Sequence, residues 1–254
     1  MNKVITFSFI ILVSLTSFNG LARNLNVGWE LWFPFQYRNK AQELVGLDIE
    51  IFKTVIKRAG LQADYVELPW KRHLRYIESG EIDIAFGASY TKEREKYAYF
   101  SIPYRLETVK LFVLKGSKVQ LNSLTDIINR DFLLGIETGY YYGDKFEKLM
   151  QSSKFKEHTN EVLDIEQNIS MLLKGRINGL LADPNTINAF CEKYKITGEL
   201  EQFPLDIYQT DVHMMLSRKS LNTEVLTKIN TAITALKKEG TLDKIIEKWS
   251  LVAD

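Results

Sequence analysis

The stretch Glu81-Ile82-Asp83-Ile84-Ala85-Phe86-Gly87-Ala88-Ser89-Tyr90-Thr91-Lys92-Glu93-Arg94 decides how this chain is interpreted. Its apolar residues predict a buried strand, followed by a loop of small residues. Gly87 and Ser89 allow a ligand to approach the backbone closely, and Arg94 can bind a carboxylate through two parallel hydrogen bonds. The stretch predicts a seat for an acidic headgroup, although a strand end followed by a solvated charged turn explains it equally well.

Helix and strand patterns alternate on both sides of this stretch. The segment Leu47–Ala59 has its apolar residues on one face and ends before Gly60, as expected of an amphipathic helix. Alternation of this kind predicts an α/β fold with parallel sheets covered on both faces. The other segments expected as strands are Leu25–Gly28, Ala63–Leu68, Ile82–Phe86, Phe132–Ile136 and Gly179–Ala182, and the other expected helices are Arg72–Ser79, Leu124–Asn129, Asp144–Gln151, Ile165–Lys174, Thr186–Tyr194, Glu224–Glu239 and Leu242–Trp249.

An internal echo relates the two halves of the chain. Ile77–Asp83 is matched by Leu172–Asn178, each reading as a helix, a glycine stop and an isoleucine before an apolar strand. The two strands end near Ser89 and Asp183, and ligands of open α/β sheets bind at the carboxyl ends of strands. Two facing lobes would give one ligand a carboxylate site and an ammonium site. The plainer alternative is that helices often stop at glycine, so that two ordinary units look alike.

Large aromatic residues follow two of the expected strands. Trp32 lies in the loop Trp29–Phe35, which Pro34 stiffens, and Trp70 follows Pro69 in a similar position. Small polar molecules are usually bound between aromatic walls with a few placed polar groups. Core packing is the commoner role of a single tryptophan, but the strand-end positions favour a cleft for both.

Two further candidates lie in the second half. Tyr140 belongs to the loop Gly139–Asp144, which opens an expected helix whose free N–H groups favour an anion. Its ring could close over a ligand or pack on the surface. Asp183 precedes Pro184, a common helix entry, so its simplest role is a helix cap. Pairing with a ligand ammonium is the second role, and the two are compatible.

The first 22 residues predict a cleaved secretory signal peptide. Lys3 precedes an apolar run, Val4–Phe18, and Gly20-Leu21-Ala22 supplies small residues for cleavage after Ala22. The run is shorter than the ~20 apolar residues that a bilayer demands, and no cysteine follows it to carry a lipid anchor. We therefore expect a soluble exported protein in the periplasm.

Charge and composition exclude several classes of partner and cofactor. Without Lys3, the 33 basic residues become 32 and equal the 32 acidic residues. A neutral chain with mixed charges lacks the basic stripe of a nucleic-acid binder and the cationic face of a membrane-surface helix. One cysteine, Cys191, and three histidines without ligand spacing predict no disulfide, no metal site and no cofactor.

Together these motifs resemble the bacterial extracellular solute-binding proteins of family 3, the polar amino-acid binding proteins of ABC importers. The resemblance covers essentially the whole chain after the signal peptide. It implies a two-lobed, type II periplasmic-binding fold with two hinge crossovers, a ligand cleft between the lobes and a monomeric protein. Lobe 1 is expected at residues 23–106 plus 212–254, and lobe 2 at 107–211. The matching segments are Leu25–Phe35, Leu44–Asp48, Ser79–Asp83, Gly87-x-Ser89-x-Thr91-x-x-Arg94, Phe100–Tyr104 and Gly240–Ile245.

The resemblance also assigns roles by position. The arginine of the family's Thr-x-x-Arg motif binds the ligand α-carboxylate, which implies this role for Arg94. Ser89 and Gly87 occupy the positions of the small hydroxyl residue and the loop glycine at the same site.

Three more positions carry a role from the family. Asp183 would take the α-ammonium, Trp32 would stack on the ligand, and Glu30 falls where some members hold an acidic residue for a cationic side chain. The aromatic first loop and Pro69-Trp70-Lys71-Arg72 depart from the well-known lysine, histidine and glutamine binders, so the ligand itself stays open.

The expected mechanism is binding without chemistry, in which hinge bending closes the lobes on a small amino-acid-like ligand. The closed form would dock on a membrane ABC permease or a sensor kinase. Two alternatives come from the same fold. One is a periplasmic enzyme similar to cyclohexadienyl dehydratase, with Glu30 or Asp183 as acid or base. The other is a dedicated ligand sensor.

Overall fold

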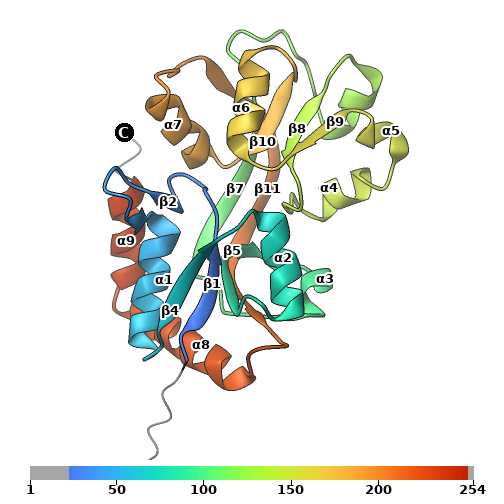
Figure 1. The fold of residues 1–254 in the computed structure, drawn as a ribbon. Helices are drawn as coiled ribbons and strands as arrows, with labels where there is room; N and C mark the ends of the chain where they lie inside the picture. The colour runs from blue at the N-terminus through green and yellow to red at the C-terminus, as the bar shows by residue number, and fades with distance from the viewer. Residues whose placement is uncertain (1–22, 251–254) are drawn as a thin grey trace, which may run out of the picture.

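The computed structural model describes residues 23–250, so the expected signal peptide lies outside the described residues. Two lobes stack end to end, and the long strands β7 (Arg105–Leu114) and β11 (Leu200–Ser217) run from one to the other (Figure 1). In the described part of the chain, no helix combines the length and the apolar character needed to cross a membrane.

The first lobe holds both ends of the described chain. Strands β4, β1 and β5 pair in parallel, and β6 adds antiparallel to β11. Its helices flank these strands (Figure 1). Its elements are β1 (Leu25–Trp29), β2 (Tyr37–Arg38), β3 (Leu44–Val45), α1 (Leu47–Arg58), β4 (Ala63–Glu67), α2 (Trp70–Ser79), β5 (Ile84–Ser89), α3 (Lys92–Glu95), β6 (Ala98–Phe100), α8 (Thr223–Lys238) and α9 (Thr241–Ser250).

The second lobe repeats this arrangement. Strands β10, β8 and β9 pair in parallel, and β10 joins β7 antiparallel. Its elements are a 3₁₀ helix (Leu124–Asn129), β8 (Leu134–Glu137), α4 (Asp144–Leu149), α5 (Ser153–Lys156), β9 (Thr159–Val162), α6 (Ile165–Leu173), β10 (Gly179–Ala182) and α7 (Pro184–Lys193). The two segments that match each other in the sequence form equivalent helix–strand units, α2–β5 and α6–β10, so the internal echo is confirmed.

The expectation of parallel sheets is met within each lobe but not for the sheet as a whole, which is mixed. One mixed sheet runs through the described chain in the order β4-β1-β5-β11-β7-β10-β8-β9, and β7 and β11 pair antiparallel with each other and with their neighbours. The expected parallel units are present, but each ends at one of these two connecting strands. Polar residues alternate through both connecting strands, which conceals them in a search for apolar runs.

Each lobe has its own core. In the first lobe, Ile51, Phe52 and Val55 of α1 are fully buried against β1 and β5, as the amphipathic pattern predicts. In the second lobe, β8 and β10 are buried between helices. Separate cores joined by two strands allow the lobes to move as bodies, since bending at a few residues disturbs neither core.

Candidate functional site

A cavity lies where the two lobes meet, at the carboxyl ends of β1, β5 and β8. Its water-accessible volume is only about 10 Å³, so the lobes are closed over it. Seven of the eight residues singled out from the sequence line it. The full lining is Glu30, Trp32, Gln36, Trp70, Phe86, Gly87, Ser89, Arg94, Tyr140 and Tyr141. We call it the interlobe cavity.

Gly87 shapes the floor of this cavity. Its φ of +78° is one that L side chains rarely adopt, and a Cβ there would lie 3.0 Å from the Trp32 ring and 3.1 Å from Gln36 Nε2. Its N–H donates to the Tyr104 hydroxyl at 2.9 Å. The backbone after β5 is thus held close to the cavity, as the small-residue loop predicts.

Arg94 is the buried cation of the cavity wall. Its side chain is 7% exposed and lies 5.5 Å from the centre of the Trp70 ring. The guanidinium donates to Ser89 O at 2.9 Å and, across the lobes, to Gly139 O at 3.0 Å. Within residues 23–250 no carboxylate forms an ion pair with it. Burial lowers its pKa from the usual value, the direction expected of a desolvated cation.

Glu30, Trp32 and Trp70 form the first-lobe side of the cavity. Pro69 offers no side-chain cap to α2, and the Glu30 carboxylate instead accepts a hydrogen bond from the Trp70 N–H at 2.8 Å. Glu30 as a whole is half-buried, yet burial of its carboxylate raises its pKa to about 8. Trp32 reaches the other lobe, where its Nε1 donates to Thr186 Oγ1 at 3.0 Å.

Tyr140 extends from the second lobe toward Trp32. The two rings meet edge to face with centres 6.3 Å apart. The Tyr140 hydroxyl donates to Glu107, which is 2% exposed and lies on the connecting strand β7. Burial raises the pKa of Glu107 to about 7, with Arg105 and the Tyr140 hydrogen bond opposing the shift. Of the two roles left open for this ring, the structure places it at the cavity.

Asp183 lies beside the cavity but does not line it. It caps α7, accepting hydrogen bonds from Asn185 N at 2.8 Å and from Thr108 N at 3.4 Å. The side chain is 5% exposed, and burial raises its pKa while Arg105 opposes the change. The helix-cap role is therefore present, and the carboxylate also faces the hinge.

The hinge contains a buried ion pair that the sequence did not reveal. Arg105 binds the Asp48 carboxylate through two hydrogen bonds of 2.6 and 2.8 Å, and the exposed fractions of the two side chains are 3% and 0%. The Arg105 guanidinium lies 5.2 Å from the centre of the Trp32 ring and 4.3 Å from that of Phe35. The pair fixes the first loop and the start of α1 to the connecting strand.

Sequence reasoning missed several residues at the interlobe cavity. Phe86 and Tyr141 adjoin chosen residues, and Gln36 accepts a hydrogen bond from Glu30 N at 3.2 Å. Glu137 is not one of the lining residues, but it ends β8 beside the tyrosine loop, one residue beyond the strand end expected at Ile136. The strand-end rule that selected Ser89 applies equally to Glu137 and could have found it.

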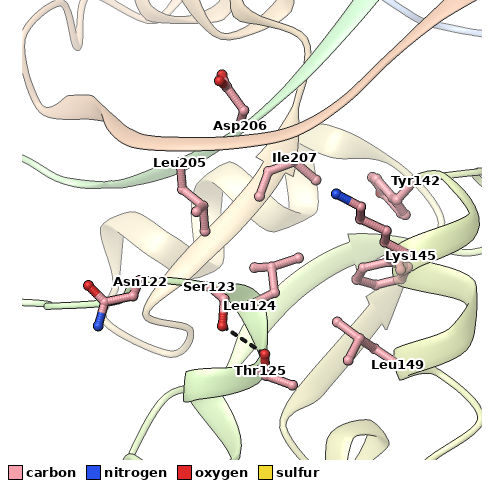
Figure 2. A pocket seen from close by; sticks show the side chains of 11 residues that line it. Asn122, Ser123, Leu124, Thr125, Tyr142, Lys145, Leu149, Leu205, Asp206 and Ile207 are labelled. Atoms are coloured by element: carbon pink, nitrogen blue, oxygen red, sulfur yellow. Dashed lines mark hydrogen bonds between the residues drawn. The ribbon is translucent and has the colours of Figure 1, made fainter.

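A second hollow lies within the second lobe, between the 3₁₀ helix, α4 and β11 (Figure 2). Its volume is about 360 Å³ by the measure used for the interlobe cavity. Lys145 points into it, but that side chain is exposed, and Asp206 is paired with Lys110. No charged side chain of its lining is buried. The hollow therefore lacks the built polar wall that marks the interlobe cavity.

Comparison with known proteins supplies the family. The model of the bacterial extracellular solute-binding proteins, family 3, matches residues 25–252. The chain belongs to this family. This match confirms the family resemblance that the sequence motifs indicated, and with it the role of the chain as a solute-binding protein.

Individual relatives are distant but cover most of the chain. The L-cystine-binding protein TcyA of Bacillus subtilis (strain 168) is 28% identical over 232 residues, 89% of this chain and 80% of the relative. The L-cystine-binding protein TcyJ of Escherichia coli (strain K12) is 24% identical over 217 residues, 85% and 78% of the two chains.

A solved structure supports the fold. An ancestral arginine-binding protein bound to arginine superposes with a TM-score of 0.78 at 26% identity, covering 89% of this chain and 97% of that one. The expected two-lobed, type II periplasmic-binding fold of this family is confirmed.

Proposed function

We propose that this family member binds one α-amino acid between its lobes and delivers it to a membrane ABC importer. Arg94 binds the α-carboxylate, Asp183 the α-ammonium, and Ser89 and Gly87 supply the backbone beside the carboxylate. Trp32, Trp70 and Tyr140 wall the ligand. The relatives named above bind cystine or arginine, two ligands that differ in side chain and share this headgroup.

One observation carries the proposal: Arg94 is a buried cation that forms no ion pair with any carboxylate of residues 23–250. Its two acceptors are neutral carbonyls, Ser89 O and Gly139 O. Moving an unpaired charge from water into the protein interior costs on the order of several kcal/mol. A ligand carboxylate can replace the weaker carbonyl acceptors with a bidentate, charge-assisted pair. The geometry therefore suits an anionic headgroup better than a neutral one.

Closure and delivery follow from the placement of the hinge. The boundaries we propose are 23–106 plus 212–254 for lobe 1 and 107–211 for lobe 2, which place both crossings on β7 and β11. Opening there breaks the Arg94–Gly139 and Trp32–Thr186 bonds and admits the ligand. Closure removes water and strengthens the remaining charge pairs.

The proposal also states where the protein works and which partners recognise it. The chain works as a monomer in the periplasm after loss of the signal peptide. Its closed form is recognised by a membrane permease, or by a sensor kinase if the ligand is reported rather than imported. No catalysed reaction is part of this function.

The direct test is calorimetric titration of ligand-stripped protein with the set of common L-amino acids and with their decarboxylated amines. We expect saturable binding by amino acids of one class and none by the corresponding amines, because an amine leaves Arg94 unpaired. Equal binding of an amino acid and its amine would contradict the carboxylate assignment.

A second candidate is elimination chemistry on a cyclic acid. The observation that favours it is Glu30, a cavity carboxyl group whose pKa of about 8 suits a general acid near neutral pH. An assay for turnover of prephenate and arogenate separates the two functions. If the protein forms product and Glu30→Gln abolishes it, the function is catalysis and not solute binding. If the protein binds amino acids and shows no turnover, the transport role is supported.

A further inference from the structure

We infer that Arg105 is a positioning residue for the closed form of the protein. From the start of β7 it holds the Trp32 ring in the orientation that lets Trp32 bond to Thr186 of the second lobe. The inference goes beyond the proposed function, which places Trp32 in the cavity wall without saying what supports it. It rests on the proposed function only where ligand affinity is concerned.

Arg105 and Asp48 form a bidentate ion pair in the protein interior. Arg105 Nε donates to Asp48 Oδ1 at 2.6 Å, and Nη2 donates to Oδ2 at 2.8 Å. Two parallel bonds to one carboxylate fix the plane of the guanidinium as well as its position. Because Asp48 lies in the first turn of α1, this helix sets the orientation of the Arg105 side chain.

The fixed guanidinium faces two aromatic rings of the first loop. Its central carbon lies 5.2 Å from the centre of the Trp32 ring and 4.3 Å from that of Phe35. The two rings also contact each other, with centres 4.5 Å apart and planes tilted by 39°. A planar guanidinium stacks on aromatic faces, and the attraction grows when the pair is removed from water. Arg105 therefore supports the Trp32 ring from the connecting strand.

Trp32 carries this support across the lobe boundary. Its Nε1 donates to Thr186 Oγ1 at 3.0 Å, and both residues are buried. Thr186 lies in the first turn of α7, in the second lobe. A hydrogen bond of this kind weakens steeply when its donor is misaligned. A Trp32 ring that is free to tilt would lose the bond, so the support of the ring also stabilises the closed form.

The Asp48 carboxylate connects the same network to the floor of the interlobe cavity. The Tyr104 hydroxyl accepts a hydrogen bond from Gly87 N at 2.9 Å and is itself hydrogen-bonded to Asp48. The backbone N–H of Asp48 donates to Phe35 O at 3.0 Å. One residue thus joins Arg105, the aromatic loop and the backbone at Gly87 into a single unit of the first lobe.

The connecting strand leaves the first lobe directly after Arg105. Arg105 pairs with Val212 of β11, where the second connecting strand returns. Three residues further along β7, Thr108 N donates to Asp183 at 3.4 Å. Bending beyond Arg105 therefore moves the second-lobe groups relative to Trp32, while Trp32 stays with Arg105. The residue that supports the aromatic wall is also the one from which the hinge begins.

A purely stabilising role explains the pair less well. The cost of removing two charges from water offsets much of their attraction, and apolar residues in place of a buried pair are often as stable. An apolar pair could fill the same space, but it would not fix a plane against which Trp32 lies. A lysine would keep the charge, yet it offers neither the fork nor the planar face.

The test follows hydrogen exchange of the Trp32 indole N–H by NMR in the ligand-free protein. Trp32→Phe identifies its signal among those of the four tryptophans. Arg105→Lys keeps a cation beside Asp48, and Arg105→Gln combined with Asp48→Asn leaves a neutral pair, so neither variant buries an unpaired charge. We expect the indole N–H to exchange at least about 10-fold faster in both variants, with unchanged exchange of the amides in β1 and α1.

A matched control comes from the same lobe. Arg58 and Glu239 also form a bidentate pair, with bonds of 2.6 and 2.8 Å, but at the surface. Arg58→Gln combined with Glu239→Gln should leave the exchange of the Trp32 indole N–H as it is. Calorimetry with L-arginine and L-cystine extends the test to binding. A probe that binds the unmodified protein should bind Arg105→Lys about 10-fold more weakly and the control equally well.

The outcomes separate this inference from the proposed function. Faster exchange at Trp32 alone supports the inference, whether or not either probe binds. Unchanged exchange at Trp32 in both Arg105 variants overturns it. Faster exchange throughout the first lobe also overturns it, because that is the result of a merely structural role. Failure of the unmodified protein to bind any α-amino acid overturns the proposed function, and the exchange measurement still decides the role of Arg105.

Discussion

The two lobes present different charges to the cavity between them. The first lobe contributes Arg94, a buried cation whose guanidinium donates hydrogen bonds to two carbonyl oxygens, together with Glu30 at the start of α2. Near the cavity, the second lobe and its connecting strand β7 contribute the carboxylates of Glu107, Glu137 and Asp183, and burial raises the pKa of each.

The proposed function assigns the opposite charges of the ligand to different lobes. In that proposal the ligand α-carboxylate binds Arg94 of the first lobe, and the α-ammonium binds Asp183 of the second. A zwitterionic amino acid reaches both groups only when the lobes close. The charge asymmetry thus couples closure to binding, because neither face is neutralised without the other.

Removal of the first-lobe cation is expected to have the largest effect. Arg94→Ala should weaken binding of arginine by at least about 300-fold, since the ligand carboxylate is left buried and unpaired. Calorimetry measures the loss. Arg75→Ala, at an exposed position on the same lobe, is the matched control and should change the affinity by less than about 2-fold.

Asp183→Asn is the corresponding change on the second-lobe face. Asparagine caps helices as well as aspartate does, so the melting temperature should stay within a few degrees while binding weakens by about 30-fold. Thermal unfolding and calorimetry are measured on the same sample. A large fall in melting temperature with unchanged affinity would show that Asp183 serves α7 alone.

His73 of the first lobe should make the stability of the protein depend on pH, although this residue has no direct part in binding. It is 1% exposed, its ring centre lies 5.6 Å from that of Trp70, and burial lowers its pKa from 6.5 to about 4, while a hydrogen bond to the Trp29 backbone opposes the shift. The unfolded chain therefore takes up a proton at a higher pH than the folded chain does. The free energy of unfolding should fall as the pH falls below 6.5, by about 2 kcal/mol between pH 7 and pH 5.

Urea unfolding at several pH values measures this contribution. In His73→Gln the part of the pH dependence that belongs to this residue should vanish, whatever the absolute stability of the variant. An unchanged difference in stability between pH 7 and pH 5 would show that His73 is protonated in the folded protein.

The pH dependence of binding tests the acidic face separately. Glu30 has a pKa of about 8 and contacts the Trp70 amide, while Asp164 and Glu137 face it with like charge. A cationic ligand requires ionised carboxylates, so protons leave on binding and the affinity should rise with pH. We expect about a tenfold gain for arginine between pH 6 and pH 8 and little change for citrulline.

Calorimetry in buffers of different ionisation enthalpy counts the released protons. The result to expect is proton release with arginine and almost none with citrulline at pH 7. Proton uptake with arginine would contradict the expected ionisation of Glu30 on binding.

The local sequence pattern predicted the site residues of the first lobe better than those of the second lobe. The apolar strand before Gly87, the small loop and Arg94 are consecutive, so one segment carried both structure and chemistry. Trp32 and Trp70 were found because they follow strands. Their mutual placement depends on parallel pairing of β1 with β4 and β5, which the alternating pattern predicts.

The residues of the hinge could not be predicted from the local sequence in the same way. Glu107 and Arg105 lie on β7, whose partner β11 is about a hundred residues away along much of its length, as in the pair Leu106–Asp211. Antiparallel pairing at that separation leaves no local signal beyond a weak polar alternation. The buried Arg105–Asp48 pair is likewise visible only when the first loop, α1 and β7 are assembled.

The most direct test of the account is one set of titrations on the unmodified, ligand-stripped protein with L-arginine, L-citrulline and agmatine. The account predicts that arginine or citrulline, which each carry an α-carboxylate, binds, whereas agmatine does not bind measurably, because an amine without the carboxylate leaves Arg94 unpaired. Agmatine binding as tightly as arginine would contradict the central claim that Arg94 awaits a ligand carboxylate.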